Sequence, residues 1–168
     1  MDYLKTKSTT TVLGDIMKQT PLESKIMAKM QPGVITYGGF LGTDRRDFIQ
    51  IIADDEKTLN KLGKTPEEIA DRLEYFQQQS FDAFESNTVV DGIYEVETEV
   101  VRGYLPCPFM HQGIYRKSYT TVTNTRSGKS FTYSALNIHL IRAHHFFEGK
   151  KSHFRLEPDE LVNELFQK

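Results

Sequence analysis

The sequence predicts one α+β domain: an N-terminal group of helices packed on a small three-stranded antiparallel sheet, followed by two C-terminal helices. Up to residue 87 the chain carries helix-start signatures and apolar residues at helical spacing. From residue 93 to residue 133, apolar and polar residues alternate instead, which is typical of strands. Helices and strands that are segregated along a chain favour the α+β class.

The 168 residues fit a single domain. We expect a flexible N-terminus over 1–11, where the chain is polar, and one domain over 12–168. The helical part of this domain covers 12–87, and a β-meander with two helices covers 88–168. No internal repeat or linker-like stretch interrupts the sequence.

Two copies of one helix-start signature mark the first helix and the longest helix. Thr20-Pro21-Leu22-Glu23 and Thr65-Pro66-Glu67-Glu68 each place a capping Thr before Pro, with Glu three residues after the cap. The Glu side chain can reach back to the cap amide, and Pro is tolerated at the first helical position. The second signature opens an expected helix over 66–85.

Another helix is expected between these two. Thr43 or Asp44 is expected to cap it, because either side chain can accept from a free amide of the first turn. Asp54 or Asp55 is then expected to start a further turn or two that ends at Gly63.

Alternation predicts three strands in a meander. The stretch 93–104 places glutamates on one face and apolar residues on the other, as in a half-buried strand. The stretch 113–123 alternates again, and a turn at 124–128 leads to a return strand at 129–133.

The rest of the chain is predicted to be helical. Ser134 is expected to cap a helix that runs to about Phe147, with Gly149 as its stop. After a basic loop, Pro158 is expected to open a closing amphipathic helix.

Composition excludes some classes of protein. Cys107 is the only cysteine, so an internal disulfide is excluded and a reducing, cytoplasmic setting is expected. No apolar run approaches the roughly 18 residues that a membrane span needs. Residues 1–11 lack the apolar stretch of a secretory signal. We therefore expect no membrane partner.

The net charge of −2 conceals an asymmetry along the chain. Residues 44–99 hold six basic and fifteen acidic side chains, which gives −9, whereas residues 100–155 hold nine basic side chains and one acid, which gives +8. The second stretch also holds all five histidines. Two interpretations stay open: an anionic partner binds the basic stretch, or the two halves neutralise each other within the fold.

Four side chains of the basic stretch could hold a metal ion. Cys107 and His111 are spaced Cys-x3-His, and His139 and His144 are spaced His-x4-His on the expected helix. On a helical wheel the last two flank the buried stripe, where both can meet the hairpin that packs against it. Zn²⁺ favours four such nitrogen and sulfur ligands in a tetrahedron. The alternative is that Cys107 is a small buried apolar residue and the histidines are ordinary helix residues.

The segment Phe131-x4-Leu136-x2-His139-x4-His144, on a strand followed by a helix, resembles the second half of a Cys2His2 zinc finger. The resemblance covers about fourteen residues and implies a zinc site at the two histidines. The sequence departs from the pattern in having one cysteine and in placing 27 residues between His111 and His139, where a finger has about a dozen. The second departure leaves the geometry of the site open.

Basic residues interleaved with aromatic rings suggest an anionic ligand. One face of the strand 113–123 carries two tyrosines and a lysine, a combination that suits single-stranded nucleic acid. The loop 148–155 carries cations that can grip a phosphate. The candidate ligand-binding residues are Tyr115, Lys117, Tyr119, Lys150, Lys151 and Arg155. The alternative is that the rings pack in the core and the lysines favour the negative end of the helix.

Two functions of different class follow from these observations. The first is a non-catalytic binding protein that engages an anionic ligand, nucleic acid or phosphate, through the basic 102–155 region and carries a structural zinc site. The second is a small enzyme that uses Cys107 or a histidine-bound metal on a phosphorylated or acyl substrate, with Asn137 or Glu148 as the orienting group. The sequence leaves open the identity of the ligand and whether any reaction is catalysed.

Overall fold

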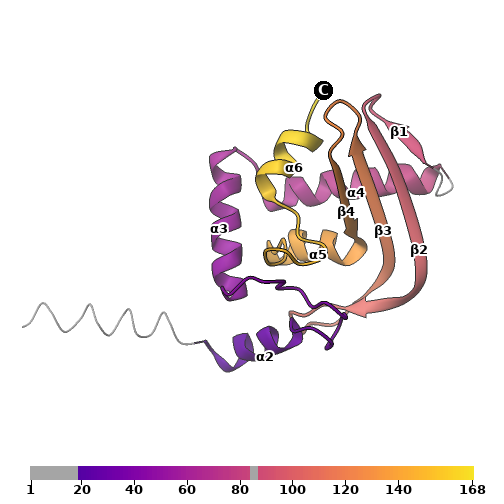
Figure 1. Cartoon of the computed structure of the whole chain (residues 1–168). Helices are drawn as coiled ribbons and strands as arrows, with labels where there is room; N and C mark the ends of the chain where they lie inside the picture. The colour runs from indigo at the N-terminus through magenta and orange to yellow at the C-terminus, as the bar shows by residue number, and fades with distance from the viewer. Residues whose placement is uncertain (1–18, 84–86) are drawn as a thin grey trace, which may run out of the picture.

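The structure of this protein is a computed structural model that describes residues 19–83 and 87–168. Within these ranges it has five helices and one four-stranded antiparallel sheet (Figure 1). The predicted α+β class is therefore confirmed. The expected flexible segment 1–11 and the last two residues of the expected helix 66–85 lie outside the described residues.

The sheet has one strand more than the sequence predicts. Its strands are β1 (Thr88–Val90), β2 (Tyr94–Pro106), β3 (Ile114–Asn124) and β4 (Ser130–Ser134), in the order β1-β2-β3-β4 with every pair antiparallel. The three-strand prediction is wrong because β1, with three residues, is too short to show an alternating pattern. β1 is joined to β2 by a tight turn, in which residues 91 and 92 both have positive φ.

Both predicted capping boxes are present. Helix α2 (Pro21–Lys29) begins after Thr20, whose hydroxyl accepts from the amide of Glu23 at 3.2 Å, while the Glu23 carboxylate accepts from the Thr20 amide at 2.8 Å. Helix α4 (Pro66–Asp82) begins after Thr65 with the same pair of bonds. The signature therefore fixes the start of each helix, because each cap satisfies amides that have no partner within the helix.

Helix α3 (Phe48–Lys61) differs from the prediction at both of its expected starts. The cap is Asp47, whose carboxylate accepts from the amide of Gln50 at 2.9 Å, and the helix continues without a break past residues 54 and 55. The expected caps Thr43 and Asp44 are wrong because other partners take them. Thr43 bonds to the backbone of residue 150, and Asp44 accepts from Arg46.

The C-terminal helices begin where the sequence predicts. Helix α5 (Ala135–His144) is capped by Ser134, and helix α6 (Pro158–Leu165) starts at Pro158. α5 ends three residues before the expected Phe147. His145 adopts the left-handed conformation at φ 56° and closes the helix, a role usually taken by glycine.

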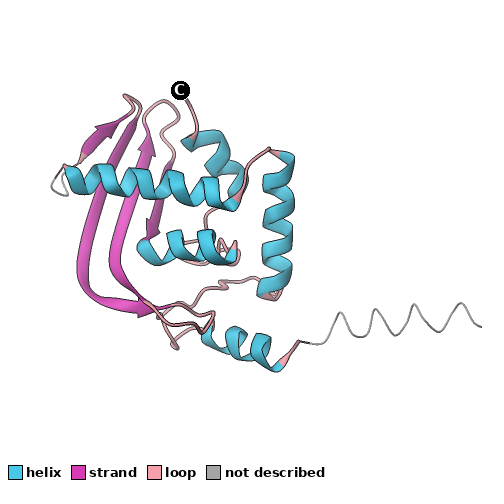
Figure 2. Cartoon of the chain, turned by 180° about the vertical axis from the view of Figure 1, so that it is seen from behind, coloured by secondary structure: helices cyan, strands magenta, loops and turns pink. Residues whose placement is uncertain are grey.

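Helices α4 and α5 lie across the same face of the sheet, as the front and rear views both show (Figures 1 and 2). The main core lies between them and the strands and includes Phe76, Tyr94 and Tyr133, all fully buried. A second apolar cluster surrounds Cys107 and Leu140 under the loops at the far end of β2 and β3. The long hairpin therefore reaches from the main core to this second cluster, where the metal-ligating candidates lie. No helix in the described part of the chain is both long and apolar enough to cross a membrane.

Candidate metal centre

The connection between β2 and β3 positions Cys107 and His111. β2 ends at Pro106, and the chain turns so that the amide of Met110 donates to the carbonyl of Cys107 at 3.3 Å. Cys107 is buried, with 4% of its surface exposed, whereas His111 is exposed. The loop thus anchors its thiol inside the second apolar cluster and presents an imidazole from outside.

Helix α5 positions the other two candidates. His139 and His144 are both half-buried, and the helix is held in place by the buried Leu136, Leu140 and Ile141. β3 pairs antiparallel with both β2 and β4, so β2 and β4 run in the same direction. The 107–113 loop after β2 and helix α5 after β4 therefore lie at the same end of the sheet. The 27 residues between His111 and His139 are occupied largely by β3 and β4, which explains the departure from zinc-finger spacing.

The ligand atoms of Cys107, His111, His139 and His144 all lie within 4.8 Å of one another. The Nε2 atom of His111 lies 2.9 Å from that of His139 and 3.0 Å from that of His144, and Cys107 Sγ lies 3.5 Å from His144 Nε2. A tetrahedral zinc site with bonds of about 2.0–2.3 Å separates its ligand atoms by roughly 3.3–3.6 Å. The three observed contacts are at or somewhat below these values and no pair exceeds 4.8 Å, so small side-chain shifts would let these four side chains hold a metal ion.

Hydrogen bonds outside the cluster determine which nitrogens face inward. His111 Nδ1 lies 2.8 Å from the carbonyl oxygen of Gln112, which can only accept, so Nδ1 carries the proton. The neutral ring then presents an Nε2 lone pair to the cluster. His139 Nδ1 bonds to the hydroxyl of Tyr115 at 2.9 Å, so its Nε2 also faces inward, and this Nε2 has a free lone pair in the tautomer in which Nδ1 donates to the hydroxyl. These are the outer-shell contacts by which proteins orient metal-binding imidazoles.

Aromatic rings hold two of the imidazoles in place. Phe109 stacks on His144 with ring centroids 4.0 Å apart and an interplanar angle of 4°. Tyr115 stacks on His139 at 4.2 Å and 23°. Both contacts restrict ring rotation, so the ligands are oriented before any ion binds.

Burial favours the neutral forms of Cys107, His139 and His144. Burial, followed by the charges of neighbouring histidines, lowers the pKa of both His139 and His144 to about 4, so both rings are neutral and able to coordinate at pH 7. Burial raises the pKa of the Cys107 thiol to about 11. A bound divalent cation reverses the second effect, because a coordinating thiol loses its proton.

The candidate ligand-binding residues fall in separate neighbourhoods. Tyr115 bonds to His139 of the candidate metal centre, and Lys117 lies against Gly103 in β2. Tyr119 stacks on Phe154, beside a cavity whose charged side chains are acidic.

The other three lie around the loop after α5. Lys150 and Lys151 are exposed, and the backbone carbonyl of Lys150 accepts from the amide of Thr43. The side chain of Arg155 is 7% exposed and forms ion pairs with Asp55 at 2.6 Å and with Glu157 at 3.0 Å. Its guanidinium is therefore already bound by carboxylates of the chain.

Sequence reasoning assigned Tyr115 to an anionic ligand and missed its contact with His139. The period-two pattern places Tyr115 on the strand face but does not show which helix residue it meets. Comparison with known protein families, with curated proteins and with solved structures finds no match to this chain. The functional argument therefore starts from the four converging side chains.

Proposed function

We propose that this chain is a non-catalytic binding protein with one structural Zn²⁺, coordinated by Cys107, His111, His139 and His144. The observation that carries the proposal is the convergence of four ligand atoms, from a loop and a helix, within 4.8 Å. The ion would fasten the 107–113 loop to helix α5. Met110 and Gly113 in this loop have positive φ, a conformation that is unfavourable for Met110. Metal coordination on both sides of Met110 would stabilise the loop in this conformation.

The donor set favours zinc in a structural role. Imidazole and thiolate together suit Zn²⁺, whereas Mg²⁺ and Ca²⁺ prefer oxygen ligands. Catalytic zinc sites usually keep one position for water or substrate, while structural sites are closed by four protein ligands. Four protein ligands are available here, which supports a structural ion over the enzymatic alternative.

Metal analysis of the purified protein tests this proposal. We expect one zinc per chain in the wild type and loss of zinc in the Cys107→Ser and His139→Ala variants. His153→Ala is the matched control, because His153 lies outside the cluster and should leave the zinc content unchanged. Fully folded wild-type protein that stays free of zinc in zinc-supplemented buffer would contradict the proposal.

The second part of the proposal is an anionic ligand at the end of the β2–β3 hairpin. Arg102, Arg116 and Lys117 come from adjacent strands at the irregularity between Val100 and Tyr104. Within residues 19–83 and 87–168, none of the three forms an ion pair with an acidic side chain. Because Arg116 and Lys117 are consecutive in β3, they point to opposite faces, so a phosphate-bearing chain such as a single-stranded oligonucleotide would contact them across the edge of the hairpin end.

Binding of a fluorescent single-stranded oligonucleotide tests this second part. Three phosphate contacts predict a slope of about −2 in a plot of log K against log salt. The Arg102→Gln/Arg116→Gln double variant should lose most of the affinity, whereas Lys25→Gln on α2 should keep it. Absence of binding at low salt, or equal loss in both variants, would remove the anionic ligand but leave the zinc site untouched.

The enzymatic alternative makes a different prediction for Cys107. A nucleophilic cysteine has a depressed pKa and reacts with alkylating agents at neutral pH. In the metal-free geometry burial raises the pKa of Cys107, which supports a structural role. Rapid alkylation of the folded, zinc-loaded protein at pH 7 would favour the enzyme.

A further inference from the structure

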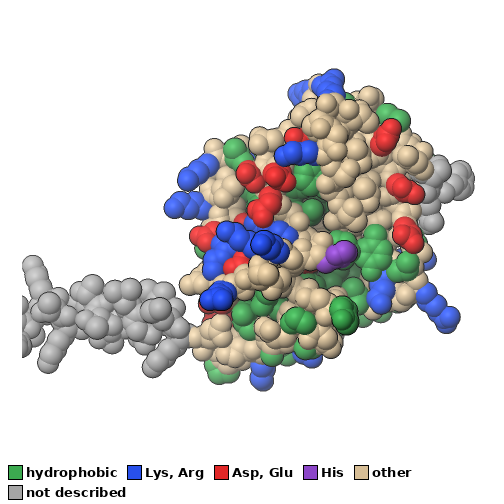
Figure 3. All heavy atoms as spheres, in the orientation of Figure 1, with side chains coloured by type: hydrophobic (Ala, Val, Ile, Leu, Met, Phe, Trp, Pro, Cys, Tyr) green, Lys and Arg blue, Asp and Glu red, His purple; other side chains and the backbone are tan. Residues whose placement is uncertain are grey.

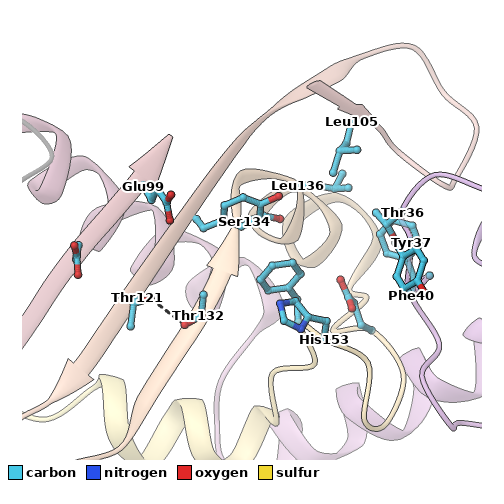
Figure 4. A pocket seen from close by; sticks show the side chains of 16 residues that line it. Thr36, Tyr37, Phe40, Glu99, Leu105, Thr121, Thr132, Ser134, Leu136 and His153 are labelled. Atoms are coloured by element: carbon cyan, nitrogen blue, oxygen red, sulfur yellow. Dashed lines mark hydrogen bonds between the residues drawn. The ribbon is translucent and has the colours of Figure 1, made fainter. Parts of the chain in front are cut away.

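A cavity of about 720 Å³ lies on the outer face of the sheet, bounded by residues 36–40 on one side and by His153 and Phe154 on another. Figure 4 shows Glu99 on the strand wall, the Thr121–Thr132 hydrogen bond across β3 and β4, and Tyr37 on the far side. None of the four metal-ligating side chains lines it. Its volume is within the range of pockets that bind small organic molecules.

The charged side chains of this cavity are acidic. Glu97 and Glu99 project from the same face of β2, opposite the buried Val96 and Thr98. Same-face neighbours on a strand are about 6.6 Å apart, so one positive group can lie between the two carboxylates. No Lys or Arg lines the cavity, and neither glutamate forms an ion pair in the part of the chain that the structure describes.

Space-filling side chains show the same separation of charge. In Figure 3 acidic side chains form a column along the right-hand side of the molecule, with Lys and Arg below it at the lower right; on the left, acidic and basic side chains are mixed. The acidic cavity and the basic hairpin end are therefore different surfaces.

The remaining walls are apolar and aromatic. Leu105 and Leu136 line one end of the cavity. The rings of Tyr119 and Phe154 stack with centroids 5.4 Å apart at 11° and form part of the wall near the carboxylates. Tyr37, which is 99% exposed, stands at the mouth. Aromatic faces attract cations within about 6 Å of the ring, so rings and carboxylates favour the same kind of ligand.

We propose that this cavity binds an organic cation, an ammonium or guanidinium group joined to an apolar or aromatic body. The head group lies between Glu97 and Glu99, and the body packs against the rings of Tyr119, the pairing partner of Glu99, and Phe154. A negatively charged molecule is repelled by the two carboxylates, and a wholly apolar one leaves them desolvated without a partner. The proposal is independent of the zinc site, because the cavity and the metal centre share no lining side chain.

Three probes that differ only in the head group test this proposal on the full, zinc-supplemented chain: 2-phenylethylamine, 2-phenylethanol and 3-phenylpropanoate. Titration followed by NMR should show saturable binding of the amine, with shifts at Tyr119 and Phe154. The alcohol should bind at least tenfold more weakly, and the carboxylate should not saturate.

Matched glutamate variants then locate the site. Glu97→Gln/Glu99→Gln should weaken amine binding at least tenfold without changing the melting temperature. Glu95→Gln should leave the affinity unchanged, since Glu95 is on the same face of β2 but does not line the cavity. The proposal is overturned if the amine does not saturate, if the carboxylate binds as well as the amine, or if Glu95→Gln loses as much affinity as the double variant.

Discussion

The hydroxyl of Tyr115 sets the orientation of the His139 ring through its bond to Nδ1. Outer-shell partners of this kind contribute to metal affinity because they fix the tautomer of the ligand. We predict that Tyr115→Phe lowers zinc affinity about 10–100-fold while the phenyl ring keeps its stacking on His139. Competition with a chromophoric chelator measures the affinity.

Tyr104→Phe is the control for this prediction, because Tyr104 is on the same hairpin and is 59% exposed. Its zinc affinity should equal that of the wild type. Equal affinity in both variants would mean that the Tyr115 hydroxyl plays no part in holding the metal.

The buried carboxyl group of Glu148 makes the stability of the protein depend on pH. Burial raises its pKa to about 7, although Asn137 and Ser152 both donate to its carboxylate. Because the folded state holds the proton more tightly than the unfolded state, its stabilising effect is complete below about pH 4.5. The effect is lost as the pH rises to about 7, which lowers the free energy of unfolding by about 3 kcal/mol.

Glu148→Gln removes this titration and can keep both hydrogen bonds, since an amide can accept from Asn137 and donate to Ser152. We therefore expect the variant to gain stability relative to the wild type between pH 5 and pH 8. Urea unfolding of both proteins at the two pH values measures the difference. Parallel pH profiles would show that Glu148 titrates as it does in an unfolded chain.

At the scale of elements, the loop before α3 crosses the loop after α5 with backbone against backbone. The amide of Thr43 donates to the carbonyl of Lys150 at 2.9 Å. A Cβ atom on Gly42 would lie 2.3 Å from that carbonyl oxygen, and the φ of Gly42 is +56°. Only glycine fits this crossing, which holds α3 beside the C-terminal half of the chain.

We predict that Gly42→Ala lowers the free energy of unfolding by at least about 3 kcal/mol, since it combines a backbone clash with an unfavourable φ. Gly63→Ala is the matched control: its φ is +66°, but a Cβ there meets nothing within 4 Å. It should cost only about 1–2 kcal/mol. Equal losses in urea unfolding would show that the crossing adds nothing beyond the backbone preference.

The start of a helix was predictable where neighbouring residues in the sequence determine it. The capping boxes at Thr20 and Thr65 satisfy helix amides with neighbouring side chains, so the sequence alone indicates both starts. The start of α3 was not predictable in this way. Several acidic residues can cap there, and the bonds of Asp44 to the Lys150 amide and of Asp55 to Arg155 decide among them. Strand β1 is set by pairing with β2 rather than by its own three residues.

At the scale of the whole molecule, the charge asymmetry is partly neutralised within the fold. Arg142 pairs with Asp71 and Glu74, and Arg155 pairs with Asp55, so two cations of the basic stretch meet acids of the acidic stretch. Net charge along a sequence gives no information on such long-range pairs. For this reason the sequence could not separate the cations that remain for a ligand from those that hold the fold.

The metal cluster was more predictable than the ligand-binding set. Thiol and imidazole donors are few in this chain, so the two spaced pairs, Cys107 with His111 and His139 with His144, suffice to name the four residues. Their convergence depends on the hairpin returning beside α5, which only the assembled sheet provides. Tyr115 shows the limit of the approach, because its contact with His139 joins two elements that are distant in sequence.

X-ray absorption at the zinc edge of the purified, zinc-loaded protein tests the central claim most directly. The account predicts a four-coordinate shell of three nitrogens at about 2.0–2.1 Å and one sulfur at about 2.3 Å. In Cys107→Ser the sulfur should disappear from the shell. A shell of oxygen and nitrogen without sulfur in the wild-type protein would contradict coordination by Cys107, His111, His139 and His144.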